Sequence, residues 1–184
     1  MALAVVLGVL GVASAVWWVI SYNRFVRQRN LVQESWRQVD VELRRRHELI
    51  PNVVETVKAF ADHELNVFST VLDARTRAVH AETVGAHGSA EAAVEASLRQ
   101  LFALAEAYPD IKSAESFRQL QTQLAESEDR VAAGRRFYNA NVRALNTRVE
   151  TLPSALVART SGFVRAEYFE LGDADARGPV QVAF

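Results

Sequence analysis

The feature that most constrains this chain is the apolar run near its first residue. Residues 2–20, ALAVVLGVLGVASAVWWVI, contain no charged side chain. As an α-helix this run would be roughly 28 Å long, close to the thickness of the hydrocarbon core of a bilayer. The run therefore predicts a transmembrane helix, and we assign residues 1–21 to a membrane anchor.

A cleaved signal peptide is the alternative interpretation of this run. Ala13, Ser14 and Ala15 would satisfy a cleavage site made of small residues. However, no lysine or arginine precedes the apolar residues, and the run continues over residues 16–20 beyond that site. The anchor is therefore the favoured interpretation.

Aromatic and basic residues mark the end of the predicted membrane helix. Trp17, Trp18 and Tyr22 lie where an aromatic belt at the membrane interface is expected, and Arg24 follows them. Only Met1 precedes the run, whereas arginines follow it at positions 24, 27, 29 and 37. The positive-inside rule then predicts a single-pass protein in the cell membrane, with its N-terminus outside and the larger part in the cytoplasm. An extracytoplasmic bundle is the alternative.

The spacing of apolar residues predicts that the rest of the chain is helical. Apolar side chains recur at intervals of 3, 4 and 7, which is typical of one helix face and of a coiled coil. Four such stripes run over residues 25–50, 54–79, 94–108 and 117–152. The predicted fold class is all-α, with the transmembrane helix followed by a long antiparallel up-and-down four-helix bundle. We assign the bundle to residues 22–171 and expect residues 172–184 to form a mobile tail.

Pro51 decides where the first helix of this bundle is expected to end. Proline lacks a backbone donor and disfavours the helical conformation of Ile50, so the helix should stop near residues 47–48. Asn52 and Glu55 have the spacing of a capping box that would begin a new helix. We therefore expect the chain to reverse at Pro51 rather than to bend there.

Glycines and prolines predict the remaining boundaries. Residues 84–93, VGAHGSAEAA, are expected to form a loop, with Ser89 as the N-cap of the next helix. Pro109 is expected to separate the third helix from the fourth, and Pro153 to end the fourth. A short helix would then follow and stop at Gly162.

Composition and motifs give no support for an enzyme or a cofactor. The 184-residue chain has a formal net charge of −1, so no global field attracts nucleic acid. It contains no cysteine, which excludes disulfides, thiolate metal sites and a cysteine nucleophile. The four histidines lack the glutamate three residues earlier that di-iron bundles use, and Val67 replaces the second histidine of a zinc-protease motif in HELNV. We expect solvated or capping histidines, no metal and no catalytic residues.

Arg44, Arg45 and Arg46 are the remaining candidate binding site. Arginines can bind phosphate or a partner's carboxylates with two parallel hydrogen bonds. The favoured alternative is that these side chains are solvated and complement the C-terminal end of a helix that stops before Pro51. An upright helix would place them roughly 40 Å from the bilayer, out of reach of its surface potential.

Three motifs make the chain resemble the LemA family of bacterial membrane proteins. They are RRHELIPN at residues 45–52, AYPD at 107–110 and RRFYN at 135–139. The resemblance implies an N-terminal membrane helix, an N-out orientation and a long antiparallel four-helix bundle, and it transfers no catalytic or ligand-binding residue. Gly134 and Thr160 depart from the expected pattern. Gly134 should cost its helix up to about 1 kcal/mol relative to alanine.

Two functions remain open on this basis. The first is a membrane-tethered adaptor or scaffold of the bacterial cell envelope, without enzymatic activity, that binds an unidentified protein or a second copy of itself. The second is an enzyme or small-ligand sensor with a site in the bundle around Tyr138, Asn141 and Asn146. Buried asparagines need hydrogen-bond partners, which neighbouring helices could supply as well as a ligand.

Overall fold

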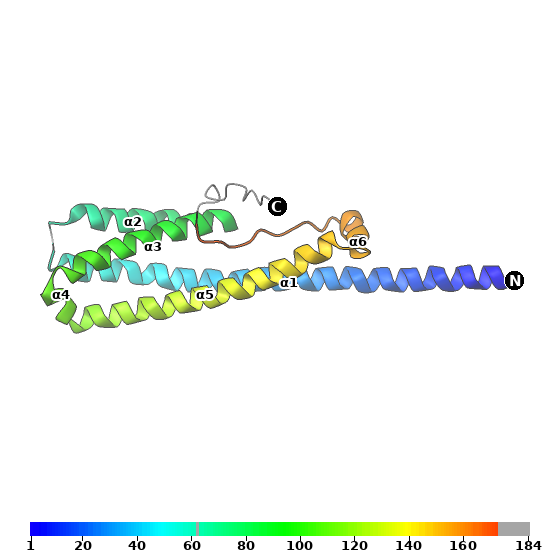
Figure 1. The fold of residues 1–184 in the computed structure, drawn as a ribbon, viewed down its shortest axis with the longest axis horizontal. Helices are drawn as coiled ribbons and strands as arrows, with labels where there is room; N and C mark the ends of the chain where they lie inside the picture. Colours follow the sequence, from blue (N-terminus) through cyan, green and yellow to red (C-terminus); the bar gives the residue numbers. More distant parts are fainter. Residues whose placement is uncertain (62, 173–184) are drawn as a thin grey trace, which may run out of the picture. The chain divides into compact units, whose positions relative to one another are not determined.

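The computed structural model of the chain describes residues 1–61 and 63–172. This part contains six helices and no strand, and Figure 1 shows how the helices follow one another along the chain. The helices are α1 (Ala2–Lys58), α2 (Leu65–Val79), α3 (Val84–Glu106), α4 (Pro109–Ser113), α5 (Glu115–Glu150) and α6 (Ser154–Ser161). The predicted all-α helical fold is therefore confirmed. Apart from Gly172, the predicted tail lies outside the described residues.

The helices are divided between two compact units. The first, which we call the anchor unit, consists of Met1–Arg37 and Arg136–Glu167. The second, which we call the core unit, consists of Gln38–Arg135 and Tyr168–Phe184. Both α1 and α5 therefore contribute residues to each unit.

The apolar run forms the first part of α1. It lies in a helix that is long and apolar enough to cross a membrane, and no residue of its most apolar window is buried within the protein. An apolar helical surface that no protein covers is expected to contact lipid. The same helix continues directly to Ser21 and Phe25, which are buried, and this continuity favours an anchor over a cleaved signal peptide.

Aromatic side chains form the centre of the anchor unit. The ring of Phe163, which follows α6, stacks on Phe25 of α1 with 4.8 Å between ring centroids. The ring of Tyr22 contacts Phe163 edge-on at 5.6 Å. The segment after α6 is therefore packed against α1 just beyond the apolar run.

The core unit buries apolar side chains of five helices, α1 to α5. In Figure 1, α2 and α3 lie side by side, and the short connection between them makes the pair antiparallel. The largest fully buried aliphatic side chains include Val53 of α1, Val71 of α2, Leu101 of α3 and Ile111 of α4. Burial of such side chains is worth about 1.5–3 kcal/mol each, so this core supplies most of the stability of the unit.

The predicted reversal at Pro51 is wrong. α1 continues through Pro51 to Lys58, and the next helix, α2, begins only at Leu65. A proline inside a helix costs about 3 kcal/mol. Ile50, Val53 and Val57 are completely buried on the same helix, and their combined burial at about 1.5–3 kcal/mol each outweighs that cost.

A side chain from α2 replaces the hydrogen bond that Pro51 cannot make. In a regular helix the N–H of residue 51 would donate to the carbonyl of His47. Here Arg75 Nε of α2 donates to that carbonyl at 2.7 Å. The acceptor is therefore satisfied, and α2 is fastened to α1 at the position of the proline.

The predicted loop at residues 84–93 is also wrong, because α3 begins at Val84. The N-cap is Thr83, whose side-chain oxygen accepts a hydrogen bond from Ala86 N at 3.1 Å, and Ser89 lies inside the helix. A Cβ atom on Gly88 would lie 2.1 Å from the carbonyl oxygen of Glu170. Glycine is therefore needed at position 88 because another segment of the chain crosses close to the helix.

The boundaries predicted at Pro109 and Pro153 agree with the structure. Pro109 separates α3 from α5 and begins the short helix α4, and α5 ends at Glu150 before Pro153. α6 then ends at Gly162, which has a left-handed φ of 72°. Local breaker residues thus determine this part of the chain.

Candidate functional site

The arginine triplet divides into two exposed side chains and one buried one. Arg44 and Arg45 are exposed, and Arg44 Nη2 donates to Asp40 at 2.7 Å. Arg46 is only 4% exposed. The helix-end interpretation of the triplet is wrong because α1 continues to Lys58. Arg46 is also too buried to reach an external phosphate, whereas binding by Arg44 and Arg45 stays a prediction.

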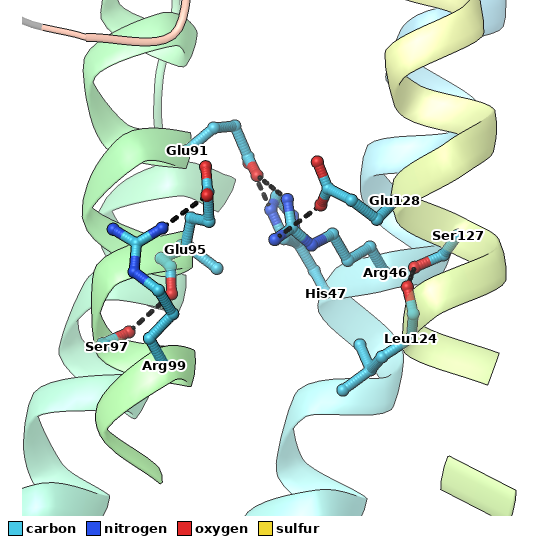
Figure 2. Close-up of polar contacts among 10 residues, drawn as sticks. Arg46, His47, Glu91, Glu95, Ser97, Arg99, Leu124, Ser127 and Glu128 are labelled. Carbon is cyan, nitrogen blue, oxygen red and sulfur yellow. Dashed lines mark hydrogen bonds and ion pairs between the residues drawn. The ribbon is translucent and has the colours of Figure 1, made fainter. Parts of the chain in front are cut away.

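Arg46 belongs to a buried charge network that Figure 2 shows. Its Nη1 donates to Glu91 of α3 at 3.2 Å, and its Nη2 lies 2.9 Å from Glu128 of α5. The contact with Glu128 is an ion pair without the angular geometry of a hydrogen bond. The guanidinium therefore links three helices of the core unit.

Glu91 is the centre of this network and is 0% exposed. Besides Arg46 Nη1, its carboxylate accepts a hydrogen bond from His47 Nε2 at 2.6 Å (Figure 2). Since a carboxylate can only accept, the Nε2 atom carries a proton. The expectation of solvated or capping histidines is therefore wrong for His47, which is buried and paired.

The burial and pairing of these side chains indicate that the network has a structural role. A buried carboxylate is tolerated when a charged partner and hydrogen-bond donors compensate for its lost hydration; here Arg46 supplies the charge and His47 a second hydrogen bond. Nearby, burial lowers the pKa of His87 below its ordinary value, against the opposing influence of Asp40 and Glu91. Within the described residues, no group of three or more histidine, aspartate or glutamate side chains could hold a metal ion.

In the anchor unit, Tyr138 and Asn146 of α5 hold the segment that follows α6. We call residues 163–167 the strap. Tyr138 Oη donates to Glu167 O at 2.8 Å, and Asn146 exchanges two hydrogen bonds with the backbone of Ala166, at 2.9 and 2.8 Å. Burial, with a contribution from Glu167, raises the pKa of Tyr138 to about 12.

These contacts account for two of the three side chains of the ligand site predicted around Tyr138, Asn141 and Asn146. Two of the three side chains hold the strap, and the backbone carbonyl of Asn141 accepts a hydrogen bond from Gln28 at 3.1 Å. The polarity of Tyr138 and Asn146 is therefore explained by contacts within the anchor unit, whereas the side-chain Nδ2 of Asn141 is buried without a hydrogen-bond partner among the described residues.

A crevice of about 540 Å³, which we call the interface crevice, lies in the anchor unit where the apolar run ends. It is lined by Trp17, Ile20, Ser21 and Arg24 of α1, and by Ala144, Thr147, Arg148, Thr151, Pro153 and Ser154. Two of the four predicted interface residues, Trp17 and Arg24, therefore line it. Trp18 is exposed, and Tyr22 contacts Phe163.

α2 carries an apolar stripe that the protein does not bury. Leu65, Leu72 and Val79 belong to the apolar stripe that the sequence shows over residues 54–79, but they are 61%, 37% and 49% exposed. The buried face of α2 consists instead of Phe68, Val71, Ala74 and Ala78. The three exposed side chains, spaced seven residues apart, form what we call the α2 stripe.

Sequence reasoning missed Glu91 and Arg148 for different reasons. Glu91 lies three residues before Val94 and so extends the core-facing stripe of α3. This spacing was overlooked because residues 84–93 were predicted to form a loop. No local signal connects Arg148 with Arg24, because they are brought together only by the packing of α5 against α1.

The fold and the anchor define a membrane-associated helical-bundle protein. The chain belongs to the LemA family, whose family model matches residues 35–184. It is also similar to three curated magnetosome proteins. MamQ 2 and MamQ 1 of Paramagnetospirillum magneticum are each 30% identical over 175 residues, and MamQ of Magnetospirillum gryphiswaldense is 28% identical over 174. These alignments cover 80–81% of this chain but only 64% of each relative.

Proposed function

We propose that this protein is a membrane-tethered adaptor, without enzymatic activity, that binds a helix of another protein of the bacterial cell envelope. The observation that carries the proposal is the α2 stripe. Isolated exposed apolar residues are ordinary, but three at heptad spacing on one helix form a seam suited to a partner helix. Ser69 lies between Leu65 and Leu72 and is small enough for a second helix to approach closely.

The charge of the core unit indicates which kind of helix would bind. The anchor unit contains nine arginines and three glutamates, a formal net charge of +6. Since the whole chain has a net charge of −1, the core unit carries −7. An amphipathic partner helix with basic residues beside its apolar face would complement this charge.

The same charge distribution supports the orientation that we propose for the chain. The arginine-rich anchor unit contains the apolar run, and positive charge beside a membrane helix favours the cytoplasmic side. The bundle would then lie in the cytoplasm, with the N-terminus outside. The partner helix would then lie on the cytoplasmic side of the membrane.

Site-specific photo-crosslinking in cells tests the adaptor proposal. A photoreactive phenylalanine would replace Thr76, beside the α2 stripe, in the full chain at native abundance. A matched control would replace Gln123, an exposed residue of α5 in the same unit. A third chain would combine the Thr76 probe with Leu72→Gln, a surface change that should alter stability by no more than about 0.5 kcal/mol.

The expected result is one discrete adduct from position 76 that is absent from position 123 and lost with Leu72→Gln. The cross-linked peptide of the partner should map to an amphipathic helical segment with basic flanks. No adduct at position 76, or equal adducts at both positions, would overturn the proposal. An adduct with a second copy of the chain would replace the adaptor with a homo-oligomer.

A further inference from the structure

We infer that the interface crevice binds the phosphate of an anionic phospholipid through Arg24 and Arg148. The crevice belongs to the anchor unit, and the inference does not depend on the α2 stripe. Three features of the crevice support it: its level along the membrane helix, the chemistry of its lining and the exposed apolar residues beside it.

The lining of the crevice spans the level at which the apolar run gives way to charge. Trp17 and Ile20 belong to the last apolar turn of the run, whereas Arg24 is its first charged successor. Phospholipid phosphates lie at this boundary between hydrocarbon and water. One end of the crevice would therefore contact acyl chains while the other meets headgroups.

The polar end of the crevice has the chemistry of an anion site. Its lining includes two arginines, four hydroxyl side chains and no carboxylate. Neither Arg24 nor Arg148 forms an ion pair within the part of the chain that the structure describes. Glu150, which is close to Arg148 in the sequence, is paired with Arg165 at 3.1 Å. Two guanidinium groups without a carboxylate suit a phosphate and disfavour a cationic headgroup such as choline.

Contacts within the anchor unit hold one wall of the crevice in place. The guanidinium of Arg148 lies 5.8 Å from the ring centroid of Phe25. Ser154 Oγ donates to the carbonyl oxygens of Arg148 and Thr151, at 2.8 and 2.9 Å. The turn from α5 to α6 is therefore fixed before any lipid binds, which lowers the entropic cost of binding.

Exposed apolar residues continue from the same turn. Leu152 and Leu156 are 76% and 52% exposed, and Leu152 lies between the lining residues Thr151 and Pro153 in the sequence. Leucines exposed beside a membrane helix can enter the acyl-chain region while nearby arginines remain at the phosphates. This arrangement favours a lipid over free phosphate as the occupant.

Native mass spectrometry of the full chain in detergent tests the inference. The protein would be incubated with equal amounts of phosphatidylglycerol and phosphatidylcholine that have the same acyl chains. The crevice variant is Arg24→Gln with Arg148→Gln. The control is Arg136→Gln with Arg143→Gln, which removes the same charge from two exposed arginines of the anchor unit outside the crevice. A third variant, Ala144→Phe, fills the crevice without changing charge.

The wild-type chain and the control variant should each retain one phosphatidylglycerol. Loss of charged hydrogen-bond donors should weaken that binding by about ten-fold or more in the crevice variant. Ala144→Phe should weaken it similarly, and unchanged helicity would show that each variant is folded. Equal loss in the control, no preference between the lipids, or full displacement by inorganic phosphate would overturn the inference.

Discussion

Glu91 is the residue whose neutralisation should cost the core unit most. Glu91→Gln would leave Arg46 buried with Glu128 as its remaining carboxylate partner. Because Glu128 is partly exposed and compensates the buried guanidinium only in part, we expect the free energy of unfolding to fall by about 3 kcal/mol. Urea unfolding of the detergent-solubilised chain, followed by circular dichroism, would measure it.

Glu95 provides the matched control on the same helix. It forms an ion pair with Arg99 at 2.5 Å, but both side chains are exposed. Exposed pairs contribute about 1 kcal/mol or less, so Glu95→Gln should have little effect on unfolding. Equal losses for the two variants would show that burial of the Glu91 network adds nothing to stability.

The ionisation of Tyr138 should make the stability of the folded protein depend on pH in the alkaline range. The pKa of Tyr138 is raised to about 12 from 10.0, so the folded protein holds this proton between those values while the unfolded chain releases it. Stability should therefore fall as the pH rises from about 10 to about 12. Spectrophotometric titration of tyrosinate should show a late component that disappears in Tyr138→Phe. Identical titration curves for the two chains would contradict the assignment.

At the scale of elements, the continuity of α1 depends on α2. Arg75→Met would keep the packing of the side-chain stem but leave the carbonyl of His47 without its donor. We expect a loss of about 1–3 kcal/mol in the free energy of unfolding. In a Pro51→Ala background the loss should be smaller, because the backbone N–H that the alanine supplies can then donate to the same carbonyl.

A double-mutant cycle on Pro51 and Arg75 measures this dependence. The coupling energy should be about 1 kcal/mol or more, since the two residues serve one acceptor. Pro51→Ala alone should stabilise the chain by less than the roughly 3 kcal/mol cost of a helical proline, because Arg75 already satisfies His47. Strictly additive effects would contradict this account.

At the scale of the whole molecule, the division of charge predicts its orientation. The chain contains no cysteine, so a single Gln123→Cys on the exposed surface of α5 would report on the bundle alone. In intact cells this cysteine should be protected from a membrane-impermeant maleimide and should react after lysis. Labelling of intact cells would place the bundle outside the cytoplasm and reverse the proposed topology.

The features that the sequence determined by itself depend on the order of residues within one segment. The uncharged run at residues 2–20, the core stripe of α3 through Val94 and Leu101, and the helix end at Gly162 were all readable from the sequence. Each depends on local spacing or backbone preference, which no other part of the chain needs to supply.

Only the tertiary structure decided where local preferences are overridden. Pro51 remains helical because neighbouring aliphatic residues are buried and Arg75 supplies the missing donor. Position 88 needs glycine because the carbonyl of Glu170 crosses next to α3, and the burial of Arg46 depends on Glu91 and Glu128 from other helices. The preference of a single glycine or proline against a helix changes the free energy of folding by about 1–3 kcal/mol. Several buried contacts together exceed that, and the residues that make them are far apart in the sequence.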